Sequence, residues 1–435
     1  MIKSLKGMND ITTSESGKWQ FLEQMIHSVC RKFGFRELRT PVLERLELFK
    51  RGVGDTTDVV QKEMYDFTDK KGRAVALRPE GTSSVVRSCI QHKVFENSFI
   101  NKIYYNVPCF RYERPQSGRQ RQFYQFGAEF FGSYSAAADA ELISLAVCFL
   151  SELGICDLTV NINSVGCEKC KSGYNAALRE FFSEKQMCEL CSSRLVRNPM
   201  RLLDCKNPNC KEICRDAPVI LDLLCDDCAA HFSDLKLQLE TMGIAYCIDT
   251  GIVRGLDYYT NTVFEIKSSR LGAQSTLCGG GRYNNLVKSL GGLDVPGIGF
   301  GMGIERLLII LENYGIDIDI NQNPLLFVAT VGKEATLFAS KFVLQLRQRG
   351  IFAEKDSSGK SLNAQMKYAN KINSEFVIVL GENELKSSNA KLKDMSSGLE
   401  REIPLEINAL SESILNAQGD GLTAVYNKNN STEGV

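Results

Sequence analysis

The sequence predicts an α+β protein built on an antiparallel sheet, followed by a separate α/β module. In the first three quarters of the chain, strand-like segments come in consecutive pairs joined by polar turns, as in β-hairpins. Beyond residue 325, apolar strand-like runs alternate with helical segments, which favours a largely parallel sheet. Nine cysteines crowd between residues 167 and 228, which indicates an inserted metal or thiol module.

The composition is that of an ordinary globular chain. It has 435 residues, 43% of them hydrophobic and 24% charged, which suits about three domains and excludes wholesale disorder. Lysine plus arginine and aspartate plus glutamate each total 52, so any polyanionic partner must be bound by local basic patches. We expect a soluble, cytoplasmic protein, because no apolar run is long enough to span a membrane and the first residues lack an apolar signal core.

The first domain is expected over 1–325, interrupted by the cysteine-rich insertion over 167–232. Its first helix, over 17–33, has apolar residues at helical spacing and ends at Gly34. Two hairpins follow, because polar turns separate pairs of alternating segments. The further elements are hairpin strands over 62–68, 73–78, 102–114 and 122–132, a helix over 139–153, strands over 158–163, 262–266 and 297–304, and a helix over 305–314.

The α/β module is expected over 326–420, with a polar tail over 421–435. Its strands are continuous apolar runs, as in a sheet that is covered on both faces. In order, the module should contain a strand over 325–331, a helix that ends at 350, a strand over 351–355, a helix over 364–372 and a strand over 375–380.

The second hairpin carries polar residues on one strand face. Residues two apart on a strand share a face, so Gln125, Gly127 and Glu129 point the same way. An unpaired buried polar group costs roughly 1–3 kcal/mol, so packing alone does not explain them. Arg111 lies on the partner strand, where its planar fork can reach a phosphate or a carboxylate. A solvated hairpin with surface arginines remains the alternative for each residue taken alone.

Four glycines alternate along the last strand of this domain: Gly297, Gly299, Gly301 and Gly303. One strand face therefore lacks side chains, and a flat ring can lie against the backbone there. The absence of a G-x-G-x-x-G motif argues against a dinucleotide-binding turn, while a glycine-rich sheet corner remains the alternative. Arg306 follows in the first turn of the next helix, where it can meet a phosphate or stack on a ring.

Eight of the nine clustered cysteines fit two four-thiolate metal sites, and Cys214 is left over. Taking the pairs in chain order gives one quartet over 167–191 and a second over 205–228, whereas nested pairing is equally compatible with the spacing. We favour zinc, which can stabilise a small insertion by about 10 kcal/mol or more, over reduced thiols without metal. The candidate ligands are Cys167, Cys170, Cys188, Cys191, Cys205, Cys210, Cys225 and Cys228.

Four segments resemble, in the family's order, motifs of class II aminoacyl-tRNA synthetases, and their wording is similar to that of the histidyl enzymes. The resemblance spans nearly the whole chain, from residue 7 into the C-terminal module. One departure follows Tyr283, where Asn284 and Asn285 replace the aspartate and glycine that are common in the family. The matching segments are RTPVLE at 39–44, FRYERP at 110–115 with RQFYQFGAE at 121–129, RGLDYY at 254–259 with TVFE at 262–265, and GFGMGIER at 299–306.

The resemblance implies a homodimeric ligase that activates histidine with ATP and Mg²⁺, charges tRNA(His) and carries a C-terminal anticodon-binding domain. It also implies that Glu129 and Tyr259 hold the two imidazole nitrogens of histidine, one a donor and one an acceptor. For Thr82 the sequence alone predicts a helix N-cap, whereas the resemblance places it with Glu80 at the amino group of the substrate. The implied roles are histidine binding by Glu80, Thr82, Gln125, Glu129, Arg254 and Tyr259; catalysis by Arg111 and Arg254; ATP binding by Arg111, Glu113, Gly301, Gly303 and Arg306; and contact with the tRNA acceptor stem by Arg114, Gln116, Arg119 and Arg121.

Two alternative functions remain. Synthetase-like regulatory subunits of a histidine-biosynthesis transferase do not charge tRNA. They usually lack the C-terminal domain and have altered catalytic peptides, whereas this chain retains both the C-terminal module and the RGLDYY and TVFE segments. A class II synthetase for threonine or proline is disfavoured, because neither substrate needs the donor–acceptor pair of Glu129 and Tyr259. The insertion is expected to approach the acceptor arm of the tRNA and to lie away from the amino-acid pocket.

Overall fold

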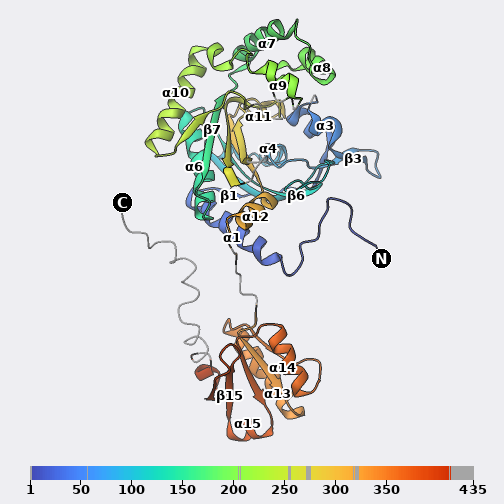
Figure 1. The fold of residues 1–435 in the computed structure, drawn as a ribbon, viewed down its shortest axis with the longest axis vertical. Coiled ribbons are helices and arrows are strands. Elements are labelled where there is room, and N and C mark those ends of the chain that lie inside the picture. The colour runs from blue at the N-terminus through green and yellow to red at the C-terminus, as the bar shows by residue number, and fades with distance from the viewer. Residues whose placement is uncertain are drawn as a thin grey trace. The chain divides into compact units, whose positions relative to one another are not determined.

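The computed structural model describes residues 2–55, 57–203, 205, 207–252, 256–270, 276–316, 318, 323–410 and 412. The chain divides into two compact units, Met1–Asp319 and Ile320–Val435 (Figure 1). Arg254 and the expected tail over 421–435 lie outside the described residues. In the described part of the chain, no helix combines the length and apolar character that crossing a membrane requires.

The first unit is organised around an eight-stranded sheet. Its strands are β1 (Arg36–Glu37), β5 (Asn101–Phe110), β6 (Gln122–Phe131), β7 (Leu158–Ser164), β8 (Tyr246–Ile248), β9 (Thr260–Ser268), β10 (Thr276–Arg282) and β11 (Gly297–Gly303). They lie in the order β1-β5-β6-β11-β10-β9-β7-β8, and all pairs are antiparallel except the two at the edges. The expected antiparallel sheet is therefore confirmed, although the sequence analysis missed β10, whose run of glycines weakens the strand signal.

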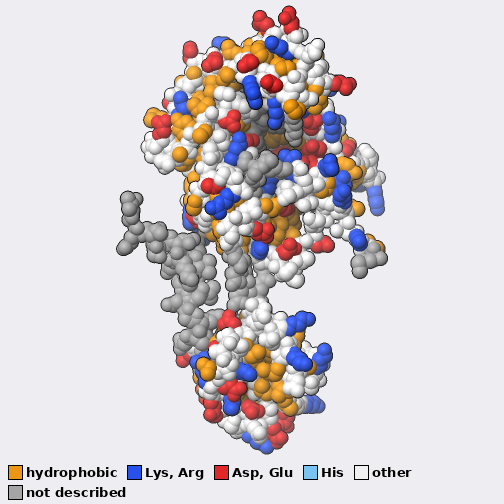
Figure 2. Space-filling view, viewed as in Figure 1, with side chains coloured by type: hydrophobic (Ala, Val, Ile, Leu, Met, Phe, Trp, Pro, Cys, Tyr) orange, Lys and Arg blue, Asp and Glu red, His pale blue; other side chains and the backbone are white. Residues whose placement is uncertain are grey.

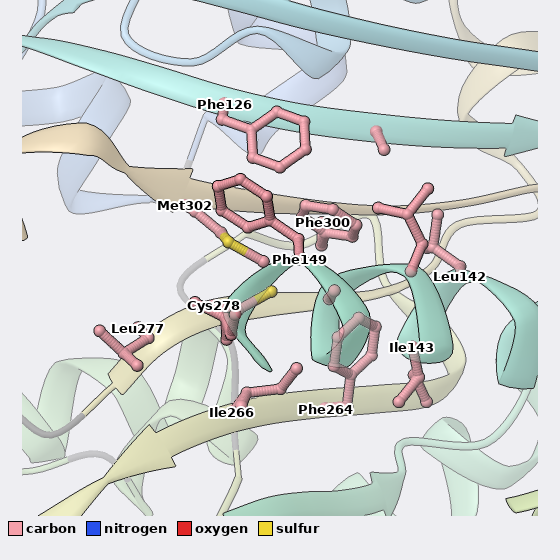
Figure 3. Close-up of a cluster of buried hydrophobic side chains, with 14 of the residues drawn as sticks. Phe126, Leu142, Ile143, Phe149, Phe264, Ile266, Leu277, Cys278, Phe300 and Met302 are labelled. Atoms are coloured by element: carbon pink, nitrogen blue, oxygen red, sulfur yellow. The ribbon is translucent and has the colours of Figure 1, made fainter. Parts of the chain in front are cut away.

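One face of this sheet packs against the helices α1 (Ser16–Lys32), α6 (Ala136–Glu152) and α12 (Ile304–Asn313) to form the main core. Phe126 of β6 meets Phe149 of α6 and Phe300 of β11 edge to face, with ring centroids 5.1 and 5.4 Å apart (Figure 3). Burying such a side chain contributes roughly 1.5–3 kcal/mol. Because strand residues alternate between faces, the neighbours of Phe126 on β6, residues 125, 127 and 129, face the opposite side of the sheet.

A second core lies on that opposite side, where α4 (Thr82–Gln91) covers the sheet. A three-stranded sheet in the order β2-β4-β3 precedes α4 and leads the chain into it. The strand expected from residue 62 begins only at residue 65, because Thr57 caps a short helix: its Oγ1 accepts a hydrogen bond from the backbone N–H of Val60 at 3.2 Å. The smaller elements are β2 (Leu43–Arg45), β3 (Tyr65–Thr68), β4 (Ala74–Leu77), α2 (Leu46–Phe49), a π-helical turn (Lys50–Gly54), α3 (Asp58–Lys62), α5 (Val94–Asn97) and α11 (Leu286–Ser289).

The insertion leaves the sheet after β7 and returns to it at β8. Its helices α7 (Glu168–Phe182), α8 (Glu189–Arg197), α9 (Pro208–Cys214) and α10 (Asp226–Thr241) lie together beyond one end of the sheet, in green in Figure 1, with two short 3₁₀ turns between them. The helix α10 continues past residue 232, where the insertion was expected to end, because Phe232, Leu235 and Leu239 are buried in the main core. The second half of α10 thus packs with α6.

A buried ion pair joins α6 to the sheet, and a histidine of α10 binds the same carboxylate. The carboxylate of Asp139 on α6 pairs with Arg282 of β10, and it accepts hydrogen bonds from Nε2 of His231 at 2.8 Å and from the hydroxyl of Thr262 at 2.6 Å. Burial favours the neutral acid, but the charge of Arg282 and these hydrogen bonds outweigh it, so the pKa of Asp139 is lowered. Asn284 accepts a hydrogen bond from Arg282 at 3.2 Å, so the departure from the family pattern still leaves an acceptor for this arginine.

The second unit has a five-stranded sheet in the order β13-β12-β14-β15-β16. The pairs of β12 with β13 and with β14 are parallel, as expected for an alternating module, whereas β15 and β16 add an antiparallel hairpin that the sequence analysis missed. Positive and negative side chains are interspersed on the visible face of each unit, in keeping with the zero net charge (Figure 2). The elements are β12 (Leu326–Thr330), α13 (Lys333–Gln348), β13 (Ala353–Lys355), α14 (Leu362–Lys371), β14 (Phe376–Leu380), α15 (Glu382–Ser387), β15 (Asn389–Asp394) and β16 (Glu400–Pro404).

Candidate active site

A fully buried carboxylate, Glu129 of β6, lies on the face of the large sheet that is opposite the main core. Its Oε1 accepts hydrogen bonds from the hydroxyls of Thr82 at 2.7 Å and Tyr105 at 3.0 Å, and its Oε2 accepts one from the hydroxyl of Tyr283. Burial raises the pKa of Glu129 to about 8, although the hydrogen bonds from Tyr283 and Thr82 oppose the rise. Three hydroxyl donors therefore orient this buried carboxyl group.

Glycines form the sheet surface next to this carboxylate. Glu129 pairs with Gly299 of β11, which in turn pairs with Gly281 of β10. A Cβ atom on Gly299 would overlap Oε2 of Glu129, and a Cβ atom on Gly281 would lie 2.8 Å from the ring of Tyr259. Cross-strand partners point to the same face about 5 Å apart, so Glu129 and Tyr259 lie over neighbouring positions of one face. The expected strand face without side chains is present, and side chains of the protein lie against it.

The N-terminus of α4 forms the border of this site. The carboxylate of Glu80 accepts hydrogen bonds from the backbone N–H groups of Thr82 at 2.6 Å and of the next residue at 2.9 Å. These are two of the amides that a helix start leaves unpaired, so Glu80 fulfils the capping role. The predicted N-cap at Thr82 is therefore wrong, and the hydroxyl of Thr82 turns to Glu129. Gln125 accepts a hydrogen bond from the backbone N–H of Gly81 at 2.9 Å, which ties β6 to this turn.

A cluster of charges lies where the second hairpin ends. The carboxylate of Glu113 lies 3.8 Å from Arg111 and 3.5 Å from Arg119, between the two guanidinium groups. Nε of Arg111 also donates a hydrogen bond to the carbonyl of Pro79 at 2.9 Å, so the cluster adjoins the turn that carries Glu80. The strand expected to continue to residue 114 ends at residue 110, and the residues that follow are free to form this cluster.

Arg306, in the first turn of α12, holds the hairpin loop in place. Its Nε donates to the carbonyl of Gly118 at 3.2 Å, and its Nη1 donates to the carbonyl of Thr276 at 2.9 Å. Within the loop, the guanidinium of Arg121 stacks on the ring of Tyr112, 3.9 Å from its centroid. Gln116 and Arg119 exchange backbone hydrogen bonds at 3.0 and 2.9 Å, which makes the loop a tight turn, and Arg114 lies in the same loop.

A cavity of about 260 Å³ opens beside Tyr259, and residues of the insertion line part of it. Lys171 of α7 is one of them, and its ammonium group donates a hydrogen bond to the backbone carbonyl of Tyr259. Burial lowers the pKa of Lys171. The insertion was expected to lie away from the predicted amino-acid pocket, but the structure places α7 against Tyr259, one of the residues predicted to form that pocket. Because α7 begins directly after β7, which pairs with β9, its first turn lies next to the start of β9.

Comparisons with known proteins bear on this geometry. The family model described as histidyl-tRNA synthetase matches residues 7–307, and the anticodon binding domain model matches residues 326–415. This chain belongs to the histidyl-tRNA synthetase family. Its relatives include histidine–tRNA ligases of Clostridioides difficile (51% identical) and Thermoanaerobacter pseudethanolicus (52% identical), each aligned over 408 residues that cover 93% of this chain and 97% or 98% of the relative.

A solved structure of the histidyl-tRNA synthetase family agrees with the fold. The apo histidyl-tRNA synthetase of S. aureus is 38% identical and superposes with a TM-score of 0.81, and the match covers 96% of this chain and 99% of that one. The Nostoc enzyme, at 22% identity and a TM-score of 0.70, shares the fold. The expected class II architecture, an antiparallel sheet with a C-terminal anticodon-binding domain, is confirmed.

The cysteines of this histidyl-tRNA synthetase family member adopt the nested pairing. One group contains Cys167, Cys170, Cys225 and Cys228, the other contains Cys188, Cys191, Cys205 and Cys210, and within each group all Sγ atoms lie within 4.8 Å of one another. The quartets taken in chain order do not form. The nested arrangement matches the fold, because Cys167 and Cys225 precede α7 and α10, and their Sγ atoms lie 3.9 Å apart. Cys214 lies outside both groups.

Three tyrosines lie near Glu129, and two of them, Tyr105 and Tyr283, were missed as site residues in the sequence analysis, whereas Tyr258 was expected to serve in packing. Tyr105 and Tyr283 donate to the carboxylate of Glu129, and Tyr258 packs edge-on against Tyr283 with ring centroids 5.5 Å apart. Burial raises the pKa of all three phenols well above the ordinary value. For Tyr105 the hairpin register was a signal. This residue pairs with Gly127, which lies between the polar residues Gln125 and Glu129 of β6.

Proposed function

We propose that this chain activates histidine with ATP to form histidyl-adenylate and then transfers the histidyl group to the 3′ end of tRNA(His), acting in the cytoplasm as a homodimer. One observation carries the proposal: Glu129 and Tyr259 lie over neighbouring glycines on one face of the sheet. Glu80 and Thr82 border the same face. This arrangement suits an amino acid whose side chain is a flat ring with two polar atoms.

The proposed pocket matches the chemistry of an imidazole. The neutral ring has one donor and one acceptor nitrogen, which a carboxylate and a phenol can serve. The hydroxyl donors on Glu129 fix the carboxylate before the substrate arrives, which lowers the cost of binding. Glu80 supplies a negative charge for the substrate ammonium, and Gln125 assists it. An amino acid without the two ring nitrogens leaves these buried groups unpaired, which permits discrimination by roughly 10⁴-fold.

In the proposed activation step, a carboxylate oxygen of histidine attacks the α-phosphorus of ATP in line, and pyrophosphate leaves. Positioning and charge neutralisation supply most of the rate of such a transfer. Arg111 and Arg254 are proposed to bind the α-phosphate, and Arg306, Gly301 and Gly303 to bind the rest of ATP. Mg²⁺ on the remaining phosphates supplies further positive charge, and Glu113 offers a carboxylate 3.8 Å from Arg111.

In the proposed transfer step, a ribose hydroxyl at the 3′ end of the tRNA attacks the carbonyl carbon of the mixed anhydride, and AMP leaves. The hairpin loop supplies the groups that read bases and bind phosphates at the acceptor stem. The match of residues 326–415 to the anticodon binding domain supports a second tRNA contact in the C-terminal unit. The loop residues proposed to contact the acceptor stem are Arg114, Gln116, Arg119 and Arg121.

The two cysteine groups are proposed to bind structural zinc. Four thiolates are a donor set that zinc prefers, and each group supplies the four ligands that complete a tetrahedral structural site. Such an ion would stabilise the insertion and take no part in the chemical steps.

Pyrophosphate exchange with a panel of amino acids tests the proposal. We expect exchange with histidine and, at best, weak exchange with threonine, proline or the other amino acids, followed by charging of tRNA(His) in a separate assay. Exchange driven by another amino acid would reassign the substrate. No exchange with any amino acid, in a protein that remains folded, would favour a regulatory subunit and overturn the proposal.

A further inference from the structure

The two cysteine groups have different relationships to the rest of the unit. The inner group consists of Cys167, Cys170, Cys225 and Cys228, and the outer group of Cys188, Cys191, Cys205 and Cys210. We infer that zinc in the inner group positions the backbone that carries Tyr259, so that histidine binding depends on this ion far more than on the ion in the outer group. The inference rests on the proposed function and extends it to a structural control of the amino-acid pocket.

The sulfur geometry is that of a single tetrahedral ion in each group. A zinc–thiolate bond of about 2.3 Å places the sulfurs of a tetrahedron about 3.8 Å apart. Cys167 Sγ lies 3.6 Å from that of Cys170 and 3.9 Å from that of Cys225, and the Sγ atoms of Cys188 and Cys205 are 3.8 Å apart. A disulfide would require about 2 Å.

Backbone amides favour the ionised, thiolate form of a cysteine in each group. In the inner group the N–H of Cys225 donates to Sγ of Cys170 at 3.2 Å, and in the outer group the N–H of Cys188 donates to Sγ of Cys210 at 3.3 Å. Amides that point at sulfur favour the thiolate, which is the form that binds metal.

The inner group joins two helix starts. Cys167 immediately precedes α7 and Cys225 immediately precedes α10. The start of α7 lies just after β7, where the insertion leaves the sheet. Gly166 packs so closely on Cys170 that a Cβ atom there would overlap it. Any separation of the two helix starts therefore moves the backbone at the end of β7.

Two contacts link the inner group to the segment that contains Tyr259. Lys171, next to Cys170, donates a hydrogen bond to the carbonyl of Tyr259. The side-chain amide of Asn261 donates to Sγ of Cys228 at 3.4 Å. Tyr259 and Asn261 flank Thr260, the first residue of β9, so both links end on one short stretch of backbone.

The backbone of this stretch needs such support. Asn261 has a φ of 49°, in the left-handed region that a residue with a side chain seldom adopts. It is held by hydrogen bonds from the N–H of Val165 to its carbonyl at 2.7 Å and from its own N–H to the carbonyl of Gly166 at 2.9 Å. The residues that hold Asn261 thus directly precede the first inner-group cysteine.

The outer group offers a matched control. In the described part of the chain, the hydrogen bonds of its cysteines join residues of the insertion to one another. Zinc there fixes α8 against α9. Between the two cysteine pairs of this group, Asn198 and Arg201 donate hydrogen bonds to the carboxylate of Asp257 at 3.1 and 2.9 Å. Loss of this ion should therefore loosen the tip of the insertion and act through the side chain of Asp257, while the hydrogen bond of Lys171 to the backbone of Tyr259 stays in place.

The test combines a metal count with kinetics of the full-length protein. Metal analysis of freshly purified wild type should give two zinc ions per chain, and Cys225→Ser and Cys205→Ser should each give one. We expect Cys225→Ser, in the inner group, to raise the KM for histidine in pyrophosphate exchange by about tenfold or more. The KM for ATP should change by less than about threefold in both variants, and Cys205→Ser should keep the KM for histidine.

Two further variants keep the inference falsifiable if a cysteine variant fails to fold. Lys171→Met should retain two zinc ions and still weaken histidine binding, measured by calorimetry without ATP. Lys169→Met, on the exposed side of the same helix turn, should bind histidine as wild type does. Equal histidine affinity in the two lysine variants would overturn the inference.

The outcomes separate this inference from the proposed function. Wild type without zinc, or with iron in its place, would overturn the metal assignment while histidine-dependent exchange continued to support the function. Equal rises in the KM for histidine in the inner and outer variants would overturn the special role of the inner group. Wild type that holds two zinc ions and shows no histidine-dependent exchange would overturn the proposed function and leave the zinc sites supported.

Discussion

The hydroxyl of Thr82, at the start of α4, donates a hydrogen bond across 2.7 Å to Oε1 of Glu129 on β6, although threonine at a helix start commonly caps the helix. It does so because Glu80 accepts the first amides of α4. The helix start and the buried carboxylate of β6 are thereby joined into one polar site.

Removing the Thr82 donor should weaken histidine binding. Thr82→Val keeps the side-chain shape but leaves the buried carboxylate of Glu129 with one donor fewer, so we expect the KM for histidine to rise by about tenfold or more. Thr82→Ser keeps the hydroxyl and should stay within about threefold of wild type. The measurement is histidine-dependent pyrophosphate exchange, and similar KM values for the two variants would contradict the role of this hydrogen bond.

Glu129→Gln should abolish histidine activation and change how stability depends on pH. Burial raises the pKa of Glu129 from 4.5 to about 8, so the folded state binds this proton more tightly than the unfolded state does. Its contribution to stability is complete below pH 4.5 and is lost as the pH rises through about 8. Relative to wild type, the free energy of unfolding of Glu129→Gln should therefore rise over this window, by at most about 1.4 kcal/mol per pH unit.

Urea denaturation of both proteins at about pH 5 and about pH 8 measures this difference. A constant difference in the free energy of unfolding between the two pH values would show that Glu129 does not titrate in this window.

Gly299→Ala should disable the amino-acid pocket. The added methyl group would occupy the position of the Glu129 carboxylate, which must move away from its three hydroxyl donors. We expect loss of histidine-dependent exchange by about 100-fold or more, with the protein still folded by circular dichroism. Gly173→Ala is the control, because Gly173 lies within α7 with nothing inside 4 Å of an added Cβ, so that change should slightly stabilise the helix. Wild-type activity in Gly299→Ala would place the reaction elsewhere.

Arg254→Ala should separate binding from chemistry. If Arg254 neutralises the α-phosphate only as charge develops, the variant should keep the KM for ATP and lose about 100-fold or more in the rate of activation. Single-turnover formation of histidyl-adenylate measures that rate. An unchanged pyrophosphate-exchange rate would remove Arg254 from the mechanism.

Residue alternation and glycine spacing made much of the site predictable. The period of two places Gln125, Gly127 and Glu129 on one face and the four glycines of β11 on the same face, and the structure has both arrangements. These patterns are local, so a single strand contains all the information. The resemblance to class II synthetases then indicated which ligand these polar residues bind, which the spacing of residues along the strands does not indicate.

The features that sequence reasoning missed depend on contacts between distant segments. Whether Thr82 caps its helix depends on the competing carboxylate of Glu80 and on the approach of β6, and spacing along the chain reveals neither. The cysteine pairing depends on the approach of the start of α10 to the start of α7. The link from Lys171 to Tyr259 joins residues 88 positions apart, which only the pairing of β7 with β9 brings together.

The hydrogen bond between His231 and Asp139 has a practical meaning for protein engineering. Excising residues 167–232 to obtain a minimal version would discard an imidazole that contacts a fully buried carboxylate of the first unit, together with part of the apolar side of α10. Any trimmed version should therefore retain α10 from its start, or the shortened protein will expose apolar surface and tend to aggregate.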